Sequence, residues 1–289
     1  MSGEDIGYSS RAWLGDKGKV LKSGSAALAV QATSLKKWLP ALITPMWSLH
    51  CDLQGDGSDR ESLLTSVNQL AEPIKVLDVM GHDLPERHDN WIIATRHTRQ
   101  VQLSSSWDDL QWPTHRLKQQ RRFHRENGRI EIDGNSGWDD VMKLHLESRQ
   151  RKSLDGQSND LQALLTRISG ESWTYCVTAH DDSGATLASG GFVILRNGTA
   201  VYAFGGQHRS KQSGIASVAM LLAAAEEACR RGCTTFDFGG SLDAGVDKFY
   251  AEFDAEPVPI VRHIQAPWWF RWVFPKTWKA WTKQSPITS

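Results

Sequence analysis

The sequence has no excess of charge of either sign, little cysteine and no long apolar run. Its 33 basic residues balance 33 acidic ones, which argues against a protein dedicated to binding nucleic acid. Four cysteines in 289 residues are too few for a disulfide framework, and none stands with histidines at metal-ligand spacing, so we expect no metal site. No apolar run reaches membrane-spanning length and no signal-peptide pattern follows Met1, which predicts a cytoplasmic protein.

Tryptophan, by contrast, is abundant, because the chain has 13. Five of them lie close to the C-terminus among Lys and Arg residues, namely Trp268, Trp269, Trp272, Trp278 and Trp281. One interpretation is a segment packed across the domain, interrupted as a helix by Pro267 and Pro275. The other is peripheral contact with the inner membrane face, because Trp and cations suit an anionic lipid surface. Packing is the favoured interpretation.

Residues 1–106 alternate between strand and helix patterns. The predicted strands are Lys19–Ser23, Ala26–Gln31, Trp47–Leu53, Ile74–Val79 and Trp91–Leu103. The predicted helices run from a Ser34 cap to Leu42 and from an Asp59 cap to Ala71. Such alternation predicts an α/β fold, with a mixed sheet that carries helices on its faces.

Hairpin signals dominate the middle of the chain and lead into a strand–loop–helix–strand pattern. The two predicted hairpins are Trp173–Ala188, turning at Asp181–Gly184, and Gly190–Phe204, turning at Asn197-Gly198. The last hairpin strand runs into Gly205-Gly206, and a helix over Ile215–Arg230 is followed by a buried strand at Thr234–Phe238.

The loop before that helix has the sequence KQSGIA and is a predicted anion site. Small residues at a helix N-terminus leave unpaired N–H groups exposed, and the helix dipole favours a negative charge at the same place. The candidate binding residues are Lys211, Gln212, Ser213, Gly214, Ile215 and Ala216. The alternative is an ordinary glycine-containing helix start.

KQSGIA resembles the (Gln/Arg)-x-x-Gly-x-(Gly/Ala) loop with which GNAT-superfamily N-acyltransferases hold the pyrophosphate of acyl-coenzyme A. FDFGGS at residues 236–241 and GVDKFYAEF at residues 245–253 resemble the signature of the Fem-type branch of that superfamily. This branch contains peptidoglycan-bridge aminoacyl transferases and acetyltransferase-like relatives. The resemblance extends over roughly residues 107 to 265 through the order and spacing of the upstream helices.

The resemblance implies two GNAT-like units in tandem. Residues 1–106 would be a degenerate copy, residues 107–265 the acyltransferase domain, and residues 266–289 a Trp-rich basic tail. It also implies acetyl-CoA or another acyl-CoA as co-substrate, without a metal. The acceptor would be an amine of a small molecule or of the cell envelope. One position departs from the Fem signature, because Tyr250 stands where that branch has Lys, which disfavours tRNA as a partner.

Three residues are candidates for the chemistry of acyl transfer. Tyr250 follows Phe249 where the superfamily has a Tyr facing the acyl thioester, and a phenol there can protonate a leaving thiolate. The alternative for Tyr250 is a core aromatic cluster. Asp237 would orient the amine or act as a base with a raised pKa, although an Asp before Gly-Gly more often holds a turn. His208 is the alternative base, against the simpler interpretation of a solvated loop histidine.

A run of cations precedes the hairpins and has two interpretations. It consists of Arg116, Lys118, Arg121, Arg122, Arg125 and Arg129, and a smaller group follows at Arg149, Arg151 and Lys152. Few glutamates lie at the spacing that would neutralise the run within a helix. The run is therefore either a solvated helix face, which is favoured, or a surface for the phosphates of coenzyme A, a nucleotide sugar or tRNA.

Three hypotheses about function follow. The first is an acyl-CoA-dependent N-acyltransferase in which the acceptor amine attacks the thioester directly. The second keeps the branch but takes aminoacyl-tRNA as the donor and a cell-wall precursor as the acceptor. The third is a catalytically silent GNAT fold used for binding, since a fold alone does not imply activity.

Overall fold

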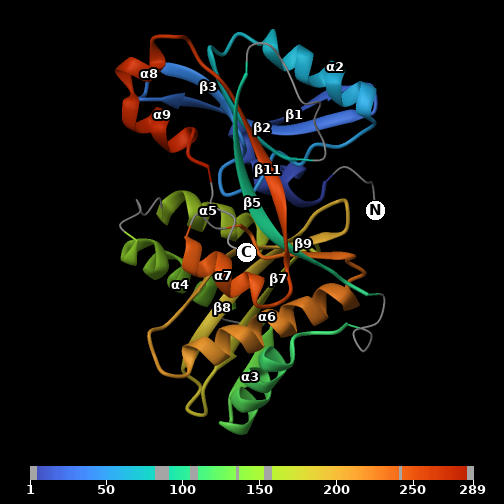
Figure 1. The fold of residues 1–289 in the computed structure, drawn as a ribbon, viewed down its shortest axis with the longest axis vertical. Coiled ribbons are helices and arrows are strands. Elements are labelled where there is room, and N and C mark those ends of the chain that lie inside the picture. Colours follow the sequence, from blue (N-terminus) through green and yellow to red (C-terminus); the bar gives the residue numbers. More distant parts are fainter. Residues whose placement is uncertain are drawn as a thin grey trace. The chain divides into compact units, whose positions relative to one another are not determined.

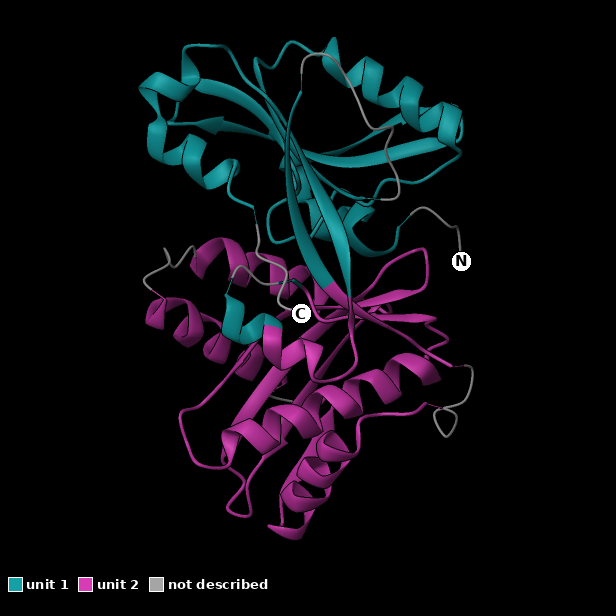
Figure 2. Ribbon diagram, viewed as in Figure 1, with its two compact units in different colours: residues 1–98, 240–247, 257–289 teal, residues 99–239, 248–256 magenta. Residues whose placement is uncertain are grey.

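The computed structural model describes residues 5–81, 91–104, 110–134, 137–152, 158–240 and 243–284. The chain divides into two compact units, which Figure 2 shows in different colours. The first unit comprises residues 1–98, 240–247 and 257–289, and the second comprises residues 99–239 and 248–256. The predicted start of the second domain, at Trp107, lies outside the described residues.

The first unit is built on a mixed sheet with the strand order β1-β2-β3-β4-β11-β5 (Figure 1). Its strands are β1 Gly18–Ser23, β2 Ala26–Leu35, β3 Leu39–Ile43, β4 Ile74–Met80, β11 Glu256–Gln265 and the first part of β5 Ile92–Gln102. The β1–β2, β2–β3 and β4–β11 pairs are antiparallel. The β3–β4 pair is parallel. A parallel pair needs a crossover connection, and here the segment that contains helix α2 (Gly57–Asn68) provides it.

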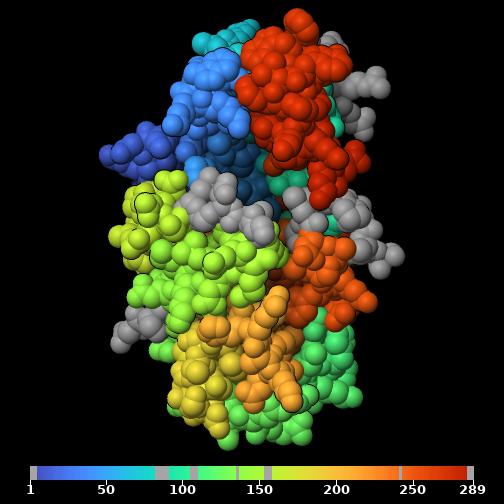
Figure 3. Space-filling model, turned by 90° about the vertical axis from the view of Figure 1, so that its left-hand side faces the viewer, coloured from blue at the N-terminus to red at the C-terminus, as the bar shows by residue number. Residues whose placement is uncertain are grey.

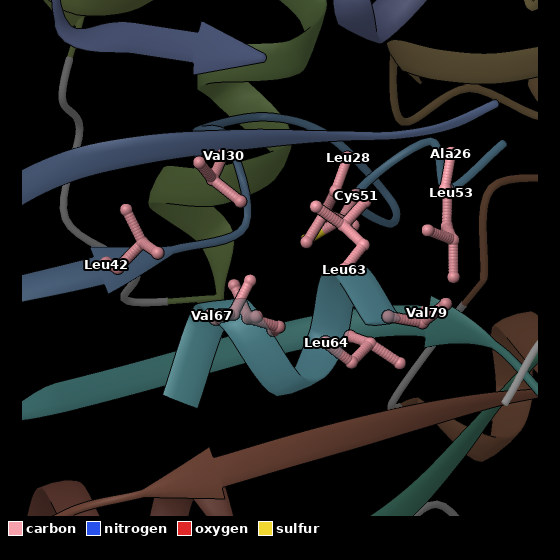
Figure 4. Close-up of a cluster of buried hydrophobic side chains, with 11 residues drawn as sticks. Ala26, Leu28, Val30, Leu42, Cys51, Leu53, Leu63, Leu64, Val67 and Val79 are labelled. Atoms are coloured by element: carbon pink, nitrogen blue, oxygen red, sulfur yellow. The ribbon is translucent and has the colours of Figure 1, made fainter. Parts of the chain in front are cut away.

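Helix α2 closes the main core of the first unit, shown in Figure 4. Leu63, Leu64 and Val67 project from it and are almost fully buried. They pack against strand residues on one face of the sheet, among them Leu28 and Val79. Each such side chain contributes on the order of 2 kcal/mol through its removal from water. Three short helical segments, η1 Gly7–Ser9, α1 Arg11–Leu14 and η2 Gly15–Lys17, lead into β1.

The C-terminal helices α8 (Phe270–Val273) and α9 (Pro275–Trp281) pack on the first unit through a second cluster. Phe270 is 2% exposed and lies against β-strand residues that include Leu39, Ile74 and Ile264. Figure 3 shows this segment in red beside the blue strands of the unit. The two helices are separate at Pro275, as the sequence predicts, because proline ends a preceding helix and suits a first turn.

The second unit is a mixed sheet with the order β5-β10-β9-β8-β7-β6. Its strands are the end of β5, β6 Arg129–Ile132, β7 Thr174–His180, β8 Thr186–Ile194, β9 Thr199–Gln207 and β10 Thr235–Asp237. Only the β9–β10 pair is parallel among the pairs described here, and helix α6 (Ser213–Arg230) connects its strands. Its other helices are α3 Thr114–Arg125, α4 Gly137–Arg151, α5 Ser158–Ile168 and the end of α7 Ala244–Ala251.

The two units share one pattern of connections. In each, three strands run antiparallel in sequence order, and a helix then leads to a fourth strand parallel to the third. The units exchange the strand that pairs with their fourth strand. Strand β5 follows β4 in the chain but pairs with β10 of the second unit. Strand β11 follows β10 in the chain but pairs with β4 of the first unit. The predicted fold class, α/β with mixed sheets and two similar units in tandem, is confirmed.

The predicted domain ranges 1–106, 107–265 and 266–289 are contiguous, and they stay a prediction. The compact units divide the chain differently, because residues 257–289 return to the first unit. Both hairpins of the second unit and the strands near Lys19, Ala26, Ile74 and Trp91 are confirmed.

Three local predictions in the first unit are wrong. The segment after Ser34 is not a helix, because β2 runs to Leu35 and turns through Lys36 and Lys37, which both have positive φ, into β3. Residues 47–53 form no strand, although Gln54 makes one bridge to Ala27. The Asp59 carboxylate does not cap α2 but accepts a hydrogen bond of 2.7 Å from the Ser25 N–H.

No helix within the described ranges is long and apolar enough to cross a membrane. The same residues contain no group of three or more His, Cys, Asp or Glu side chains arranged to hold a metal ion.

Candidate functional site

Strands β9 and β10 part at their carboxyl ends in the second unit. Their parallel pairing runs from Thr199 opposite Thr235 to Val201 opposite Asp237. Strand β9 continues beyond this point to Gln207, paired with β8. The register with β8 shifts at Ala203, which is an extra residue, so a β-bulge lies just where β10 has ended. The carboxyl ends of strands in an open α/β sheet are the usual place for ligands.

Helix α6 begins directly after this edge and is fastened to it. The Ser217 hydroxyl, in the first turns of α6, donates to the Gln207 side chain at the end of β9. Ser213 is 2% exposed and exchanges a hydrogen bond of 2.7 Å with the Ser210 hydroxyl. The Ser213 side chain therefore closes the loop, and only its backbone is available for the predicted anion contact.

The first turn of α6 leaves backbone donors open. The N–H of Ala216 donates to the Gln212 carbonyl at 2.9 Å and begins the helical ladder, so it is engaged. In the part of the chain that the structure describes, the N–H groups of Gly214 and Ile215 have no acceptor. A Cβ added to Gly214 would meet nothing within 4 Å, and Lys211 beside it is exposed. Open amides, open space and the dipole of a long helix coincide here, and together they fit a phosphate-bearing ligand.

A carboxylate lies next to this turn. The Gln212 side-chain amide donates to Glu126 at 3.1 Å, and Glu126 accepts a second bond of 2.7 Å from Arg122. These bonds, with the one from Arg122 as the larger effect, lower the pKa of Glu126. The Arg122–Glu126 pair is therefore neutral overall, and Lys211 contributes a positive charge to the loop.

Tyr250 is buried near Tyr202 and Asp237. It projects from α7, is 8% exposed and lies 5.1 Å, ring centre to ring centre, from Phe238. Burial is the main cause that raises its pKa well above the ordinary value, and the nearby Tyr202 and Asp237 raise it further. A phenol with a raised pKa keeps its proton, so Tyr250 is a hydrogen-bond donor at neutral pH. Tyr250 is part of an aromatic cluster with Phe238 and Phe249, and its role as the acid stays a prediction.

Asp237 holds the turn that follows β10. One carboxylate oxygen accepts from the Gln100 amide at 2.7 Å and the other accepts from the Gly239 N–H at 2.7 Å. Gly239 has φ of +84°, and a Cβ there would collide with the Tyr202 carbonyl oxygen. The Asp-Phe-Gly-Gly sequence is therefore explained by architecture, because it needs an Asp that binds a backbone amide and a glycine that fits against β9.

His208 lies beside helix α4. Its side chain is 40% exposed, and its Nδ1 is 3.6 Å from a carboxylate oxygen of Glu147 on α4. Among the described residues it makes no contact with Tyr250 or Asp237 that would place it in their cluster. The contacts favour the interpretation of a solvated loop histidine, and its role as a base stays a prediction.

The basic run on α3 and at the start of β6 does not share one environment. Arg116 is 2% exposed: it donates to the Phe249 carbonyl and to Glu252, both at 2.8 Å, and lies over the rings of Phe249 and Phe253. It anchors α7 to α3 and is not part of a solvated face, which corrects that prediction for this residue. The other members of the run are exposed, namely Lys118, Arg121, Arg122, Arg125 and Arg129.

His145 is a residue of this region that sequence reasoning misses. The Gly205 N–H, two residues after the bulge, donates to His145 Nδ1 at 3.2 Å. Burial, followed by the nearby Arg149, lowers the pKa of His145 from 6.5 to about 4. The ring is therefore neutral at pH 7, with its proton on Nε2, and it holds the backbone of the bulge. Gly205-Gly206 is a signal for a bulge, but nothing local connects it with a histidine 60 residues earlier.

We expect the free energy of unfolding to fall as the pH drops from 6.5 to about 4, by about 2 kcal/mol at this site. Over this range the unfolded chain binds a proton at position 145 and the folded chain does not. A His145→Asn variant keeps an acceptor for Gly205 without the titration and should show a flatter dependence in urea denaturation between pH 4 and 7. The exposed His115→Asn is the control, and equal slopes in His145→Asn and the parent would contradict the assignment.

Comparisons with known proteins agree with this geometry. Residues 114–250 match the family model described as an acetyltransferase (GNAT) domain. FemX has a similar structure, with 11% identity, a TM-score of 0.65 and coverage of 87% of this chain and 90% of its own. L-PGS from Bacillus licheniformis is also similar, with 13% identity and a TM-score of 0.59, and the match covers 88% of this chain and 85% of that one. A third similar structure is the C-terminal domain of a putative lysylphosphatidylglycerol synthetase from Agrobacterium fabrum. Its identity is 13% and its TM-score 0.58, and the match covers 87% of this chain and 85% of that one. No curated protein sequence matches significantly.

Proposed function

We propose that the protein is an N-acyltransferase that takes an acyl group, with acetyl as the first candidate, from acyl-CoA, because residues 114–250 match the family model described as an acetyltransferase (GNAT) domain. The acceptor is an amine of a small molecule or of the cell envelope, and it attacks the thioester directly. The observation that carries this proposal is the open first turn of α6, where two amides have no acceptor among the described residues and there is free space at Gly214.

The chain's own residues would divide the work of binding between two places. The N–H groups of Gly214 and Ile215, with the Lys211 ammonium, would hold the pyrophosphate, since preorganised amides at a helix N-terminus bind such groups without reorganisation. The same helix start is tied to β9 through Ser217 and Gln207, so a bound pyrophosphate would be held at a fixed place relative to the bulge.

Tyr250 would supply the proton at the leaving sulfur. Its raised pKa keeps the phenol neutral throughout the working pH range, so it is a donor whenever a negative charge develops nearby. Asp237 would act through structure, because both of its oxygens hold the backbone and Gln100 in place. His208 and its neighbour Glu147 are the remaining candidates for taking the amine proton.

Isothermal titration with acetyl-CoA and with free coenzyme A tests the donor. We expect both ligands to bind, because the pyrophosphate that the loop would hold is common to them. If neither acetyl-CoA nor coenzyme A binds at millimolar concentration, an acyl-CoA donor is rejected.

A Gly214→Asp variant should weaken binding of coenzyme A about tenfold or more. The new carboxylate would occupy the space for the phosphate and repel it, whereas the fold should tolerate it, because an acidic residue in the first turn of a helix is favourable to the dipole. Dissociation constants from titration and the melting temperature would be measured together.

Gly57→Asp is the matched control. Gly57 is also a glycine in the first turn of a helix, and a Cβ there likewise meets nothing within 4 Å. This variant should keep full affinity for coenzyme A. If Gly214→Asp binds as tightly as the parent protein, the loop does not hold the pyrophosphate.

The aminoacyl-tRNA donor remains the second candidate, favoured by the exposed cations of α3. Lys118, Arg121 and Arg125 are exposed, and their spacing of three and four residues places them on one face of that helix. The likeness to FemX is at 11% identity and speaks for the fold alone. Tyr250 in place of the Fem-type Lys still argues against this donor. Charged tRNA retained by the purified protein, with an affinity that falls steeply with salt, would favour it over acyl-CoA.

A further inference from the structure

The aromatic C-terminal segment has one buried face and one exposed face. One face packs inward: Phe270 is buried, and Trp269, Phe274, Trp278 and Trp281 lie against the same cluster of the first unit. The rings of Phe270 and Trp281 stack with centres 4.9 Å apart. These contacts fix α8 and α9 on the sheet, so packing explains this face of the segment.

The other face leaves large apolar side chains in solvent. Trp268 is 76% exposed, Trp272 68% and Val273 57%. Trp268 and Trp272 are four residues apart around the start of α8, a spacing that places side chains on one face of a helical turn. The large apolar side chains exposed in the described ranges number six, and three of them lie in this short stretch. Internal packing does not account for them.

The charged residues of this segment are all cations. Arg271 lies over the Trp272 ring at 5.2 Å, and Lys276, Lys279 and Lys283 are also exposed. No Asp or Glu occurs between residues 266 and 284, although the whole chain has equal numbers of acidic and basic residues. The segment is therefore a local positive patch around exposed tryptophans. That combination suits the boundary between headgroups and acyl chains of an anionic bilayer.

We propose that residues 268–283 form a membrane-surface site for anionic lipid. Trp268, Trp272 and Val273 enter the interfacial layer, while Arg271 and the lysines of α9 lie among the phosphates of the headgroups. The buried ring of Phe270 and its neighbours transmit this attachment to the sheet of the first unit. The proposal does not depend on the acyltransferase activity, because none of these residues belongs to the site in the second unit.

Co-sedimentation of the full-length protein with vesicles tests the site. We expect binding to vesicles of phosphatidylcholine with 30 mol% phosphatidylglycerol, little binding to pure phosphatidylcholine, and weaker binding as salt is raised. Replacing both Lys276 and Lys279 by Gln should lower the partition coefficient on the anionic vesicles about 25-fold, since each cation near such a surface contributes about fivefold.

The variant Trp268→Ser/Trp272→Ser should lower the same coefficient tenfold or more with an unchanged melting temperature, because both rings are already in solvent. Trp38→Ser is the matched control, since Trp38 is 63% exposed in the same unit but lies in the turn between β2 and β3. It should bind as the parent does. Three results would overturn the proposal: no sedimentation with anionic vesicles, equal losses in the Trp38 control, or dimers that the double variant dissociates, which would make this face a protein contact.

Discussion

A Tyr250→Phe variant should lose about 10²–10³-fold in kcat with little change in the KM for the donor. The hydroxyl is the only atom removed, and the ring keeps its contacts with Phe238 and Phe249, whose ring centres lie 5.1 and 5.8 Å away. The loss should therefore fall on the chemical step. Steady-state kinetics with acetyl-CoA and an amine found by substrate screening would measure it. The raised pKa of Tyr250 also means that an alkaline decline of kcat below pH 10 comes from another group.

Tyr175→Phe is the matched control, because its buried hydroxyl donates 2.9 Å to the Ala224 carbonyl and has a structural role. This variant should lose about 1 kcal/mol of stability and keep its kcat. Tyr202→Phe distinguishes the role of Tyr250 from that of Tyr202, the phenol close to it. A large loss of kcat in Tyr202→Phe with none in Tyr250→Phe would transfer the acid role to Tyr202, and no loss in either would remove both from the mechanism.

Replacing Asp78 by Asn should lower the free energy of unfolding by about 3–5 kcal/mol. Asp78 lies on β4 with its side chain 6% exposed and binds two guanidinium groups. Arg96 lies 2.9 Å away, and Arg262 makes two bonds of 2.8 and 2.9 Å. Desolvation already lowers the pKa of Arg96, and Arg262 lowers it further. Without the carboxylate, two largely buried cations would face each other.

Urea denaturation followed by circular dichroism measures this effect, and two further variants define it. Glu72→Gln breaks the Lys19–Glu72 pair of the same unit, in which Lys19 is 41% exposed, and should cost less than about 1 kcal/mol. Adding Arg96→Met to Asp78→Asn should recover part of the loss, since it removes one of the two cations. A loss no larger than that of Glu72→Gln would show that water screens the cluster.

Local sequence signals predict the second unit well. Asn197-Gly198 and the Asp181–Gly184 turn define their hairpins, and the sequence near Gly214 predicts where α6 begins, because turn and helix-start chemistry depends on adjacent residues. The stretch after Ser34 shows the limit of such reasoning. Lys36 and Lys37 adopt positive φ without the Gly or Asn usual at such positions, because the antiparallel pairing of β2 with β3 brings Leu35 opposite Leu39 and closes a tight turn between them.

The candidate site is only partly predictable for the same reason. Gly214 and Tyr250 lie in recognisable sequence motifs. Tyr202, His145 and Glu126 become relevant through contacts across the sheet or between helices, and the Gly205–His145 bond joins residues 60 apart. Strand β11 is also missed, because Pro257 and Pro259 weaken its strand pattern, although it pairs with β4 from Ile260 onward.

The exchange of β5 and β11 affects how the protein can fold during synthesis. The first unit lacks the strand that lies between β4 and β5 until residues near 265 have been made. About 160 residues separate the end of its N-terminal segment from β11, which corresponds to roughly 10–30 s of translation. During that time β4 presents an open edge. The N-terminal third of the chain should therefore aggregate when expressed alone, and co-expression with a fragment that carries β11 should keep it soluble.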